Sequence, residues 1–290
     1  MCFGERERAE YDRRRVMGGI AASLAAATLA APRPALGQAR AVTTAMVDIP
    51  GRDIVLRAHL ARPRDNGRHP LVVIAHGNAG LPPDIVFAAY YLAQAGFAAL
   101  VYDWGSRAPM PSDPAEREAW GRRLFKNEFV GEQIADLDAA ASFLRRQDFA
   151  AGPKIGLVGF CGGGRLALLS ATRLPNVGAV VSLYGPVDYR ERLDAEDPVP
   201  NILDVAADIN VPVQGHYGLN DAVARPDDAR RFERAMRGRR RTIEMFYYAG
   251  AGHSFCNYLR PAGSDPGYDF HAEACDLAYQ RAVRFLRRHL

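Results

Sequence analysis

Short apolar runs alternate with stretches of helical periodicity along most of the chain. The run at 71–75, Leu-Val-Val-Ile-Ala, has no polar position, which is typical of a strand buried on both faces. At 83–95 apolar residues recur with helical spacing, and Gly96 follows as a stop signal. The pattern predicts strands at 43–49, 54–61, 71–75, 97–102, 154–160, 177–184, 211–217 and 242–248, and helices at 83–95, 114–147, 162–173, 227–237 and 269–289.

This alternation predicts an α/β fold, with a mostly parallel sheet and helices on both faces. The first two strands flank a turn-rich tetrad at 50–53, so we expect an antiparallel hairpin at the sheet edge. Gly121 and Gly131 are expected to divide the long helical region. The irregular segment 185–210 follows the carboxyl end of a strand, where such sheets bind ligands, and could wall a pocket. No repeat or long linker interrupts 40–290, which we expect to be one domain.

The first 39 residues have the composition of an export signal. An arginine cluster at 13–15 precedes an Ala/Gly-rich apolar run at 18–31, and Gly37 and Ala39 offer small residues for cleavage. The run is shorter than the roughly 20 residues that span a bilayer, and the segment resembles a twin-arginine signal. We therefore expect a periplasmic or secreted protein with no stable membrane anchor after cleavage. A disordered or anchoring N-terminus is the alternative.

Composition and charge exclude several classes of protein. Apolar residues make up 48% of the chain and charged residues 24%, which is ordinary for a globular enzyme. The net charge is +4 over the full chain and +2 without residues 1–39, too little for a nucleic-acid-binding surface. The 4 cysteines are too few for a disulfide scaffold. Cys256 and Cys275 could pair in an oxidising compartment, but we expect them to remain separate thiols.

The stretch 159–164, Gly-Phe-Cys-Gly-Gly-Gly, places one reactive side chain between a predicted strand and a predicted helix. This is the thiol version of the G-x-S-x-G nucleophile elbow, in which flanking glycines allow a sharp turn that exposes the nucleophile. The helix amino terminus that follows would lower the pKa of Cys161. The glycine spacing matches neither a dinucleotide fingerprint nor a Walker A loop. A buried, inert cysteine is the remaining alternative.

A cysteine nucleophile needs a base and a group that orients the base. His253 lies in a loop of small residues after the last predicted strand, and Asp221 follows the strand before it. The order Cys161, Asp221, His253 is the nucleophile, acid, base order of an α/β-hydrolase. Other aspartates that could take the acid role are Asp188, Asp194 and Asp227.

An oxyanion hole needs two fixed N–H donors. We expect one from the amide of Gly162, directly after the nucleophile, and the other from the amide of Asn78, in the loop after strand 71–75. His76, in the same loop, is expected to support the loop rather than to act as a base.

At residues 159–163, 218–221 and 252–255 the chain resembles the dienelactone hydrolase family of α/β-hydrolases, and the likeness in element order extends over nearly all of 45–290. The resemblance implies the α/β-hydrolase fold and a Cys161, Asp221, His253 triad. It also implies hydrolysis of a small-molecule ester or lactone through a thiol ester, without a metal or organic cofactor.

Two departures from the family bear on the substrate. Gly77 stands where the family's lactone hydrolases carry a glutamate that holds the resting thiol. The resemblance assigns Arg107 to one of their two carboxylate-binding arginines, but Asn257 occupies the position four after the histidine. An anionic lactone should therefore bind less well than in those enzymes. Further pocket walls are expected from Trp104, Tyr184 and Phe255.

Two alternatives to hydrolysis remain open. A thiol redox or binding protein would use Cys161 without a triad, but it would need a resolving cysteine, for which Cys256 is the candidate. A pseudoenzyme that keeps the fold would hydrolyse no ester.

Overall fold

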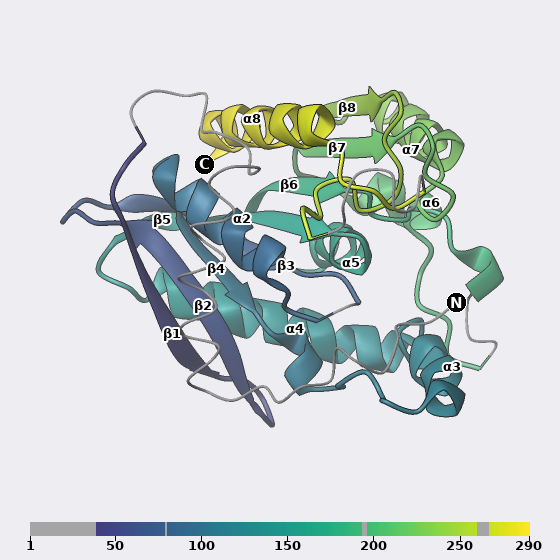
Figure 1. The fold of residues 1–290 in the computed structure, drawn as a ribbon, viewed down its shortest axis with the longest axis horizontal. Helices are drawn as coiled ribbons and strands as arrows, with labels where there is room; N and C mark the ends of the chain where they lie inside the picture. The colour runs from purple at the N-terminus through teal and green to yellow at the C-terminus, as the bar shows by residue number, and fades with distance from the viewer. Residues whose placement is uncertain (1–38, 79, 193–195, 260–266) are drawn as a thin grey trace.

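The computed structural model describes residues 39–290 apart from 79, 193–195 and 260–266 (Figure 1). The predicted export signal therefore lies almost wholly outside the described residues, as does Asp194. Within the described part of the chain, no helix is long and apolar enough to cross a membrane.

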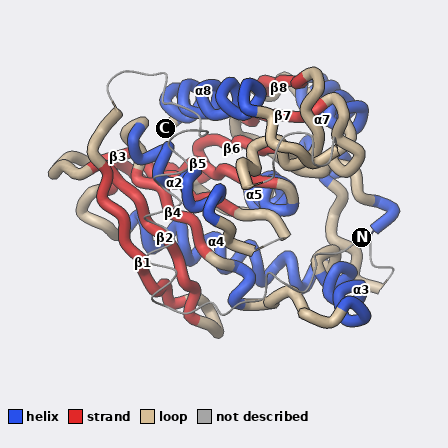
Figure 2. The backbone as a smooth tube through the Cα atoms, in the orientation of Figure 1, coloured by secondary structure: helices blue, strands red, loops and turns tan. Residues whose placement is uncertain are grey.

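One 8-stranded sheet organises the molecule, in the order β1-β2-β4-β3-β5-β6-β7-β8 (Figure 2). Its strands are β1 (Val42–Pro50), β2 (Val55–Pro63), β3 (His69–Ala75), β4 (Ala98–Tyr102), β5 (Ala150–Phe160), β6 (Val177–Leu183), β7 (Val213–Gly218) and β8 (Ile243–Tyr248). The expected hairpin is confirmed, because β1 pairs antiparallel with β2, and β2 pairs antiparallel with β4. The pairings from β4 through β3 to β8 are parallel.

Helices cover both faces of the sheet, as the alternating pattern predicts (Figure 1). They are α2 (Pro83–Gln94), α3 (Pro114–Arg123), α4 (Asn127–Arg145), α5 (Gly162–Ser170), α6 (Ile202–Val205), α7 (Pro226–Gly238) and α8 (Ala272–His289). On one face α2 packs beside α8, with the rings of Tyr91 and Tyr279 4.8 Å apart. On the other face α4 contacts α5. The α/β-hydrolase fold expected from the sequence is confirmed.

The long helical region divides at a different place from the one predicted. Gly121 lies inside α3 and Gly131 inside α4, and the break falls at residues 124–126. There the backbone pairs with the segment after β6: Asn127 N–H donates to the carbonyl of Asp197 at 2.9 Å, and Val199 N–H donates to that of Phe125 at 3.2 Å. A tertiary pairing, rather than a weak helix former, ends α3.

Candidate active site

Cys161 occupies a sharp turn between β5 and α5. Its backbone adopts φ 53° and ψ −120°, a conformation that costs a non-glycine residue free energy and is found mostly at functional sites. The turn is crowded: a Cβ on Gly159 would lie 2.2 Å from the carbonyl oxygen of Gly163, and one on Gly163 would lie 2.1 Å from that of Ala75. Only glycine fits these positions, and the half-buried thiol is the side chain that the turn presents.

The structure brings Cys161, His253 and Asp221 together from the ends of three parallel strands. His253 Nε2 lies 3.1 Å from the Cys161 Sγ, and His253 Nδ1 lies 2.9 Å from Asp221 Oδ2. The imidazole thus bridges a thiol and a carboxylate, the arrangement that Ser-His-Asp hydrolases use to move one proton.

The carboxylate is itself held in place. Asp221 is buried, and its Oδ1 accepts hydrogen bonds from the amides of Val223 and Ala224, both at 2.7 Å. Two of the alternative acids are engaged elsewhere: Asp188 pairs with Arg190 and Arg231, and Asp227 pairs with Arg230.

Electrostatics favour the charged form of the Cys161–His253 pair. Burial works to raise the pKa of the Cys161 thiol, but the charge of His253, its hydrogen bond and that of the Gly162 amide hold the pKa below its usual value. Burial likewise opposes charge on His253, yet the sulfur and the Asp221 carboxylate raise the imidazole pKa to about 9. A thiolate beside an imidazolium is the form that attacks carbonyl carbon.

The loop after β3 lies against the start of α5. A Cβ on Gly162 would lie 2.3 Å from Asn78 Oδ1, so the two residues are in close contact. His76 is buried behind this loop, its Nδ1–H can donate to the Gly77 carbonyl at 2.7 Å, and its ring stacks on Trp104 with centroids 5.0 Å apart. His76 therefore supports the loop.

A cavity of about 320 Å³ opens over the sulfur. Tyr184 lines it, with its ring edge-on to His253 at 5.4 Å between centroids. Trp104 lines an adjacent cavity of about 400 Å³ that also reaches Asn78. Phe255 is fully buried and packs on Tyr184 at 5.2 Å, so it supports the cavity wall without forming it.

The structure does not bring Arg107 to the cavity, contrary to the prediction. Its guanidinium contacts the carboxylates of Asp53 and Asp136, each at 2.6 Å, and its side chain is 6% exposed. The two carboxylates neutralise the guanidinium and occupy its N–H donors, so Arg107 is not available to bind a substrate. Asn257, at the position of the family's second arginine, does line the cavity.

The sequence did not predict three charged residues of the cavity wall. Arg165, Arg192 and Asp84 all line it. Arg165 is 3% exposed, stacks over Phe125 at 4.3 Å, and donates from Nη2 to the carbonyl of Leu124 at 2.8 Å. In the sequence, Arg165 could have been noticed as a single charged residue in the otherwise uncharged start of α5, four residues after Cys161. Asp84 could not be recognised from the sequence, because an acidic residue is common in the first turn of a helix.

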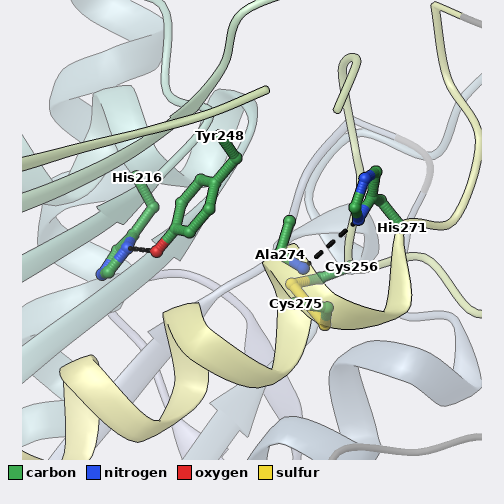
Figure 3. The surroundings of a disulfide bond; sticks show 6 residues. All are labelled: His216, Tyr248, Cys256, His271, Ala274 and Cys275. Atoms are coloured by element: carbon green, nitrogen blue, oxygen red, sulfur yellow. Dashed lines mark hydrogen bonds between the residues drawn. A yellow bond between two sulfur atoms is a disulfide. The ribbon is translucent and has the colours of Figure 1, made fainter. Parts of the chain in front are cut away.

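Cys256 and Cys275 form a disulfide bond, so the prediction of separate thiols is wrong (Figure 3). Helix α8 brings Cys275 against the loop after β8, and the two Cα atoms lie 4.9 Å apart, within the range that a disulfide needs. The bond ties α8 to the loop that carries His253. Within the described residues, no group of three or more His, Cys, Asp or Glu side chains could hold a metal ion.

The chain is similar to known hydrolases over most of its length. A model described as the dienelactone hydrolase family matches residues 56–290. A Bradyrhizobium protein assigned as a 2-oxo-3-(5-oxofuran-2-ylidene)propanoate lactonase is 31% identical over 234 residues, which cover 80% of this chain and 89% of the relative. A Methylorubrum extorquens protein assigned as a carboxymethylenebutenolidase is 31% identical over 258 residues, 86% of this chain and 87% of the relative.

A solved structure agrees with these sequence relatives. The crystal structure of a Klebsiella pneumoniae protein assigned as a dienelactone hydrolase superimposes with a TM-score of 0.74 at 26% identity, covering 86% of this chain and 100% of that one.

Proposed function

Because this chain belongs to the dienelactone hydrolase family and is a carboxylic ester or lactone hydrolase, we propose that it works through a thiol ester on Cys161, with His253 as base and Asp221 as its orienting acid. The observation that supports this most directly is the imidazole of His253, within 3.1 Å of Cys161 Sγ and 2.9 Å of Asp221 Oδ2.

In the first half of the reaction, the Cys161 thiolate attacks the carbonyl carbon and a C–S bond forms while the carbonyl π pair moves to oxygen. The amides of Gly162 and Asn78 stabilise that oxyanion. When the carbonyl re-forms, the C–O bond to the alcohol breaks, and the imidazolium of His253 gives its proton to the leaving oxygen. An acyl-enzyme remains, and from a lactone the released alcohol stays attached to the acyl group.

In the second half, water attacks the thiol ester. Neutral His253 takes a proton from that water, the oxyanion hole acts again, and the C–S bond breaks to release the acid. The thiolate and the imidazolium are restored, so each cycle consumes one water and needs no other reactant. Asp221 keeps the imidazole in the tautomer that points Nε2 at sulfur.

We propose a small ester or lactone with an acidic group as the substrate. Arg165 and Arg192 place two guanidinium groups on the cavity wall, and no ion pair within the described residues neutralises Arg165. Burial lowers the pKa of Arg165, and the positive charge of Arg192, on the wall of the same cavity, lowers it further. A substrate carboxylate would pair with both. A relative's assigned substrate, a propanoate, carries such a group.

The experiment is a comparison of two isosteric acid variants with a nucleophile variant. Cys161→Ala should abolish turnover of p-nitrophenyl acetate, and Asp221→Asn should lower kcat by about 100-fold or more because it disfavours the productive tautomer. Asp188→Asn, at a partly buried acid that pairs with arginines outside the triad, is the matched control and should keep the wild-type rate. In the wild-type protein, a rapid quench should trap an acetyl group on Cys161 by mass spectrometry.

Activity of Cys161→Ala equal to that of the wild type would reject the mechanism. Equal losses in Asp221→Asn and Asp188→Asn would show that the effect at Asp221 is not specific to its contact with His253.

We further propose that the enzyme acts after export. The predicted signal at 1–39 and the Cys256–Cys275 disulfide support the same location, because disulfides persist in the periplasm and outside the cell. Replacing Arg13 and Arg14 by lysine should retain the protein in the cytoplasm at full length. Recovery of the wild-type protein from the cytoplasm with residues 1–37 intact would contradict the proposal.

A further inference from the structure

Asp84 is a buried acid in the active-site cavity that the proposed mechanism does not use. It lies in the first turn of α2 and is 5% exposed, and it lines the same cavity as Cys161 and His253. Among the described residues its Oδ1 has no hydrogen-bond partner. A buried polar atom without a partner costs free energy, so its presence beside a nucleophile calls for a ligand that satisfies it.

Three tyrosines lie near the Asp84 carboxylate. Tyr184 follows β6, Tyr258 follows β8 and Tyr279 lies on α8. Burial raises the pKa of each of these phenols, and the charge of Asp84 raises it further. No ion pair joins Asp84 to a cation in the part of the chain that the structure describes. Burial raises the pKa of Asp84 itself to about 6, against the hydrogen bonds from the backbone at 84 and 85.

The cavity therefore has two chemically different parts. Arg165 and Arg192 make one part cationic, and the charge of Arg165 is influenced by Cys161 and Arg192. Asp84 lies by the loop that follows His253, since Tyr258 feels its charge, and Asn257 of that loop also lines the cavity. A group bound here would meet the unpaired Oδ1 of Asp84 and the side-chain amide of Asn257.

We propose that Asp84 determines specificity by accepting a hydrogen bond from a hydroxyl group that the ester or lactone carries near its reacting carbonyl. This inference rests on the proposed ester and lactone hydrolysis and adds a requirement to the substrate. A cavity of about 320 Å³ holds only a small molecule, so a hydroxyl on the carbon next to the carbonyl lies within reach of this wall. The site rejects an analogue that lacks the donor, because Asp84 then stays buried and unpaired.

Three lactones that differ at one position test the proposal: γ-butyrolactone, its α-hydroxy derivative and its α-methoxy derivative. The readout is the ratio of kcat/KM for the hydroxy and methoxy compounds, each divided by its rate of alkaline hydrolysis. In the wild-type protein at pH 7.5 this ratio should be about tenfold or more. As the pH falls through about 6 the carboxylate becomes protonated, and the ratio should fall. Titration of Cys161 and His253 affects both lactones alike and cancels.

Two variants and one control locate the effect. Asp84→Leu should bring the ratio close to one. Asp84→Asn keeps an accepting oxygen, so part of the preference should remain while its dependence on pH near 6 disappears. Asp276→Asn is the control, because burial also raises the pKa of Asp276 but that residue lies on α8 and is not among those that line the cavity. It should behave as the wild type.

A wild-type ratio near one, or the wild-type ratio in Asp84→Leu, would overturn the proposal. If Asp84→Leu does not fold, a preference in Asp84→Asn that still titrates near pH 6 would overturn it. Both results leave the hydrolysis of unsubstituted γ-butyrolactone intact and so leave the proposed function standing. Absence of turnover with all three lactones and with p-nitrophenyl acetate would overturn the proposed function as well.

Discussion

Reduction of the Cys256–Cys275 disulfide should lower the stability of the protein by about 3 kcal/mol. The bond closes a loop with a sequence separation of 19. For a loop of that length the chain-entropy relation gives about −11 cal/mol/K, or about 3 kcal/mol at 25 °C. In a domain of this size that free energy corresponds to a melting temperature lower by about 6–12 °C.

The assay compares thermal unfolding of the wild-type protein with and without a phosphine reductant. Cys256→Ser/Cys275→Ser should melt close to the reduced wild type and should not respond to reductant. Cys161→Ser keeps the disulfide, so it controls for effects of reductant on the nucleophile and should lose as much stability on reduction as the wild type.

Activity should survive the loss of the bond at 25 °C. The loop after His253 is also held by Phe255, which packs on Tyr184 and on Tyr248, both at 5.2 Å between centroids. Inactivation on heating should therefore begin earlier without any large change in kcat at 25 °C. A melting temperature that does not change on reduction would refute the reasoning.

Three further predictions follow from buried charges. Iodoacetamide should alkylate Cys161 in the absence of substrate. The rate of alkylation, measured by mass spectrometry, should decrease as the pH falls below the lowered pKa of Cys161, and it should be lower in Asp221→Asn than in the wild type. Burial lowers the pKa of His216 to about 3, so between pH 6.5 and 4 this histidine takes up a proton only in the unfolded chain. The free energy of unfolding should therefore fall by about 1.4 kcal/mol per pH unit over that range. Urea unfolding measures this, and His216→Gln should lack the contribution. Arg107→Met should cost about 3–5 kcal/mol in the same assay, because Asp136 is fully buried, and should change kcat/KM by less than twofold.

The elements, and the proximity of Cys161, Asp221 and His253, could be predicted because their signals are local. Apolar runs and helical spacing mark strands and helices wherever tertiary packing agrees with them. The carboxyl ends of parallel strands meet at one edge of the sheet, so a cysteine, an aspartate and a histidine that follow three such strands can be placed together without coordinates. The distances at His253 agree with that argument.

The predictions that were wrong concern residues whose contacts are with residues distant in sequence. Asp53 comes from the hairpin loop and Asp136 from α4, and only the fold shows that they surround Arg107. Cys275 meets Cys256 only because α8 returns along the sheet, and the break before α4 arises from pairing with residues 197–199. In each case a long-range contact decided the outcome.

The resting state that we expect for the Cys161 thiol follows from Gly77 and from the hydrogen bond with His253. A Cβ at Gly77 would lie 3.2 Å from the Cβ of Cys161 and 3.9 Å from its sulfur, so a side chain at this position would reach the thiol directly. The resemblance to the family's lactone hydrolases implies a glutamate at this position, whereas Gly77 has no side chain. The side chain of His253 lies at hydrogen-bond distance from the sulfur, at 3.1 Å. The thiolate–imidazolium pair should exist before substrate arrives, from the lowered pKa of Cys161 up to about pH 9, where the imidazolium loses its proton. Substrate binding need not displace a competing carboxylate, so selectivity has to come from the charged cavity wall.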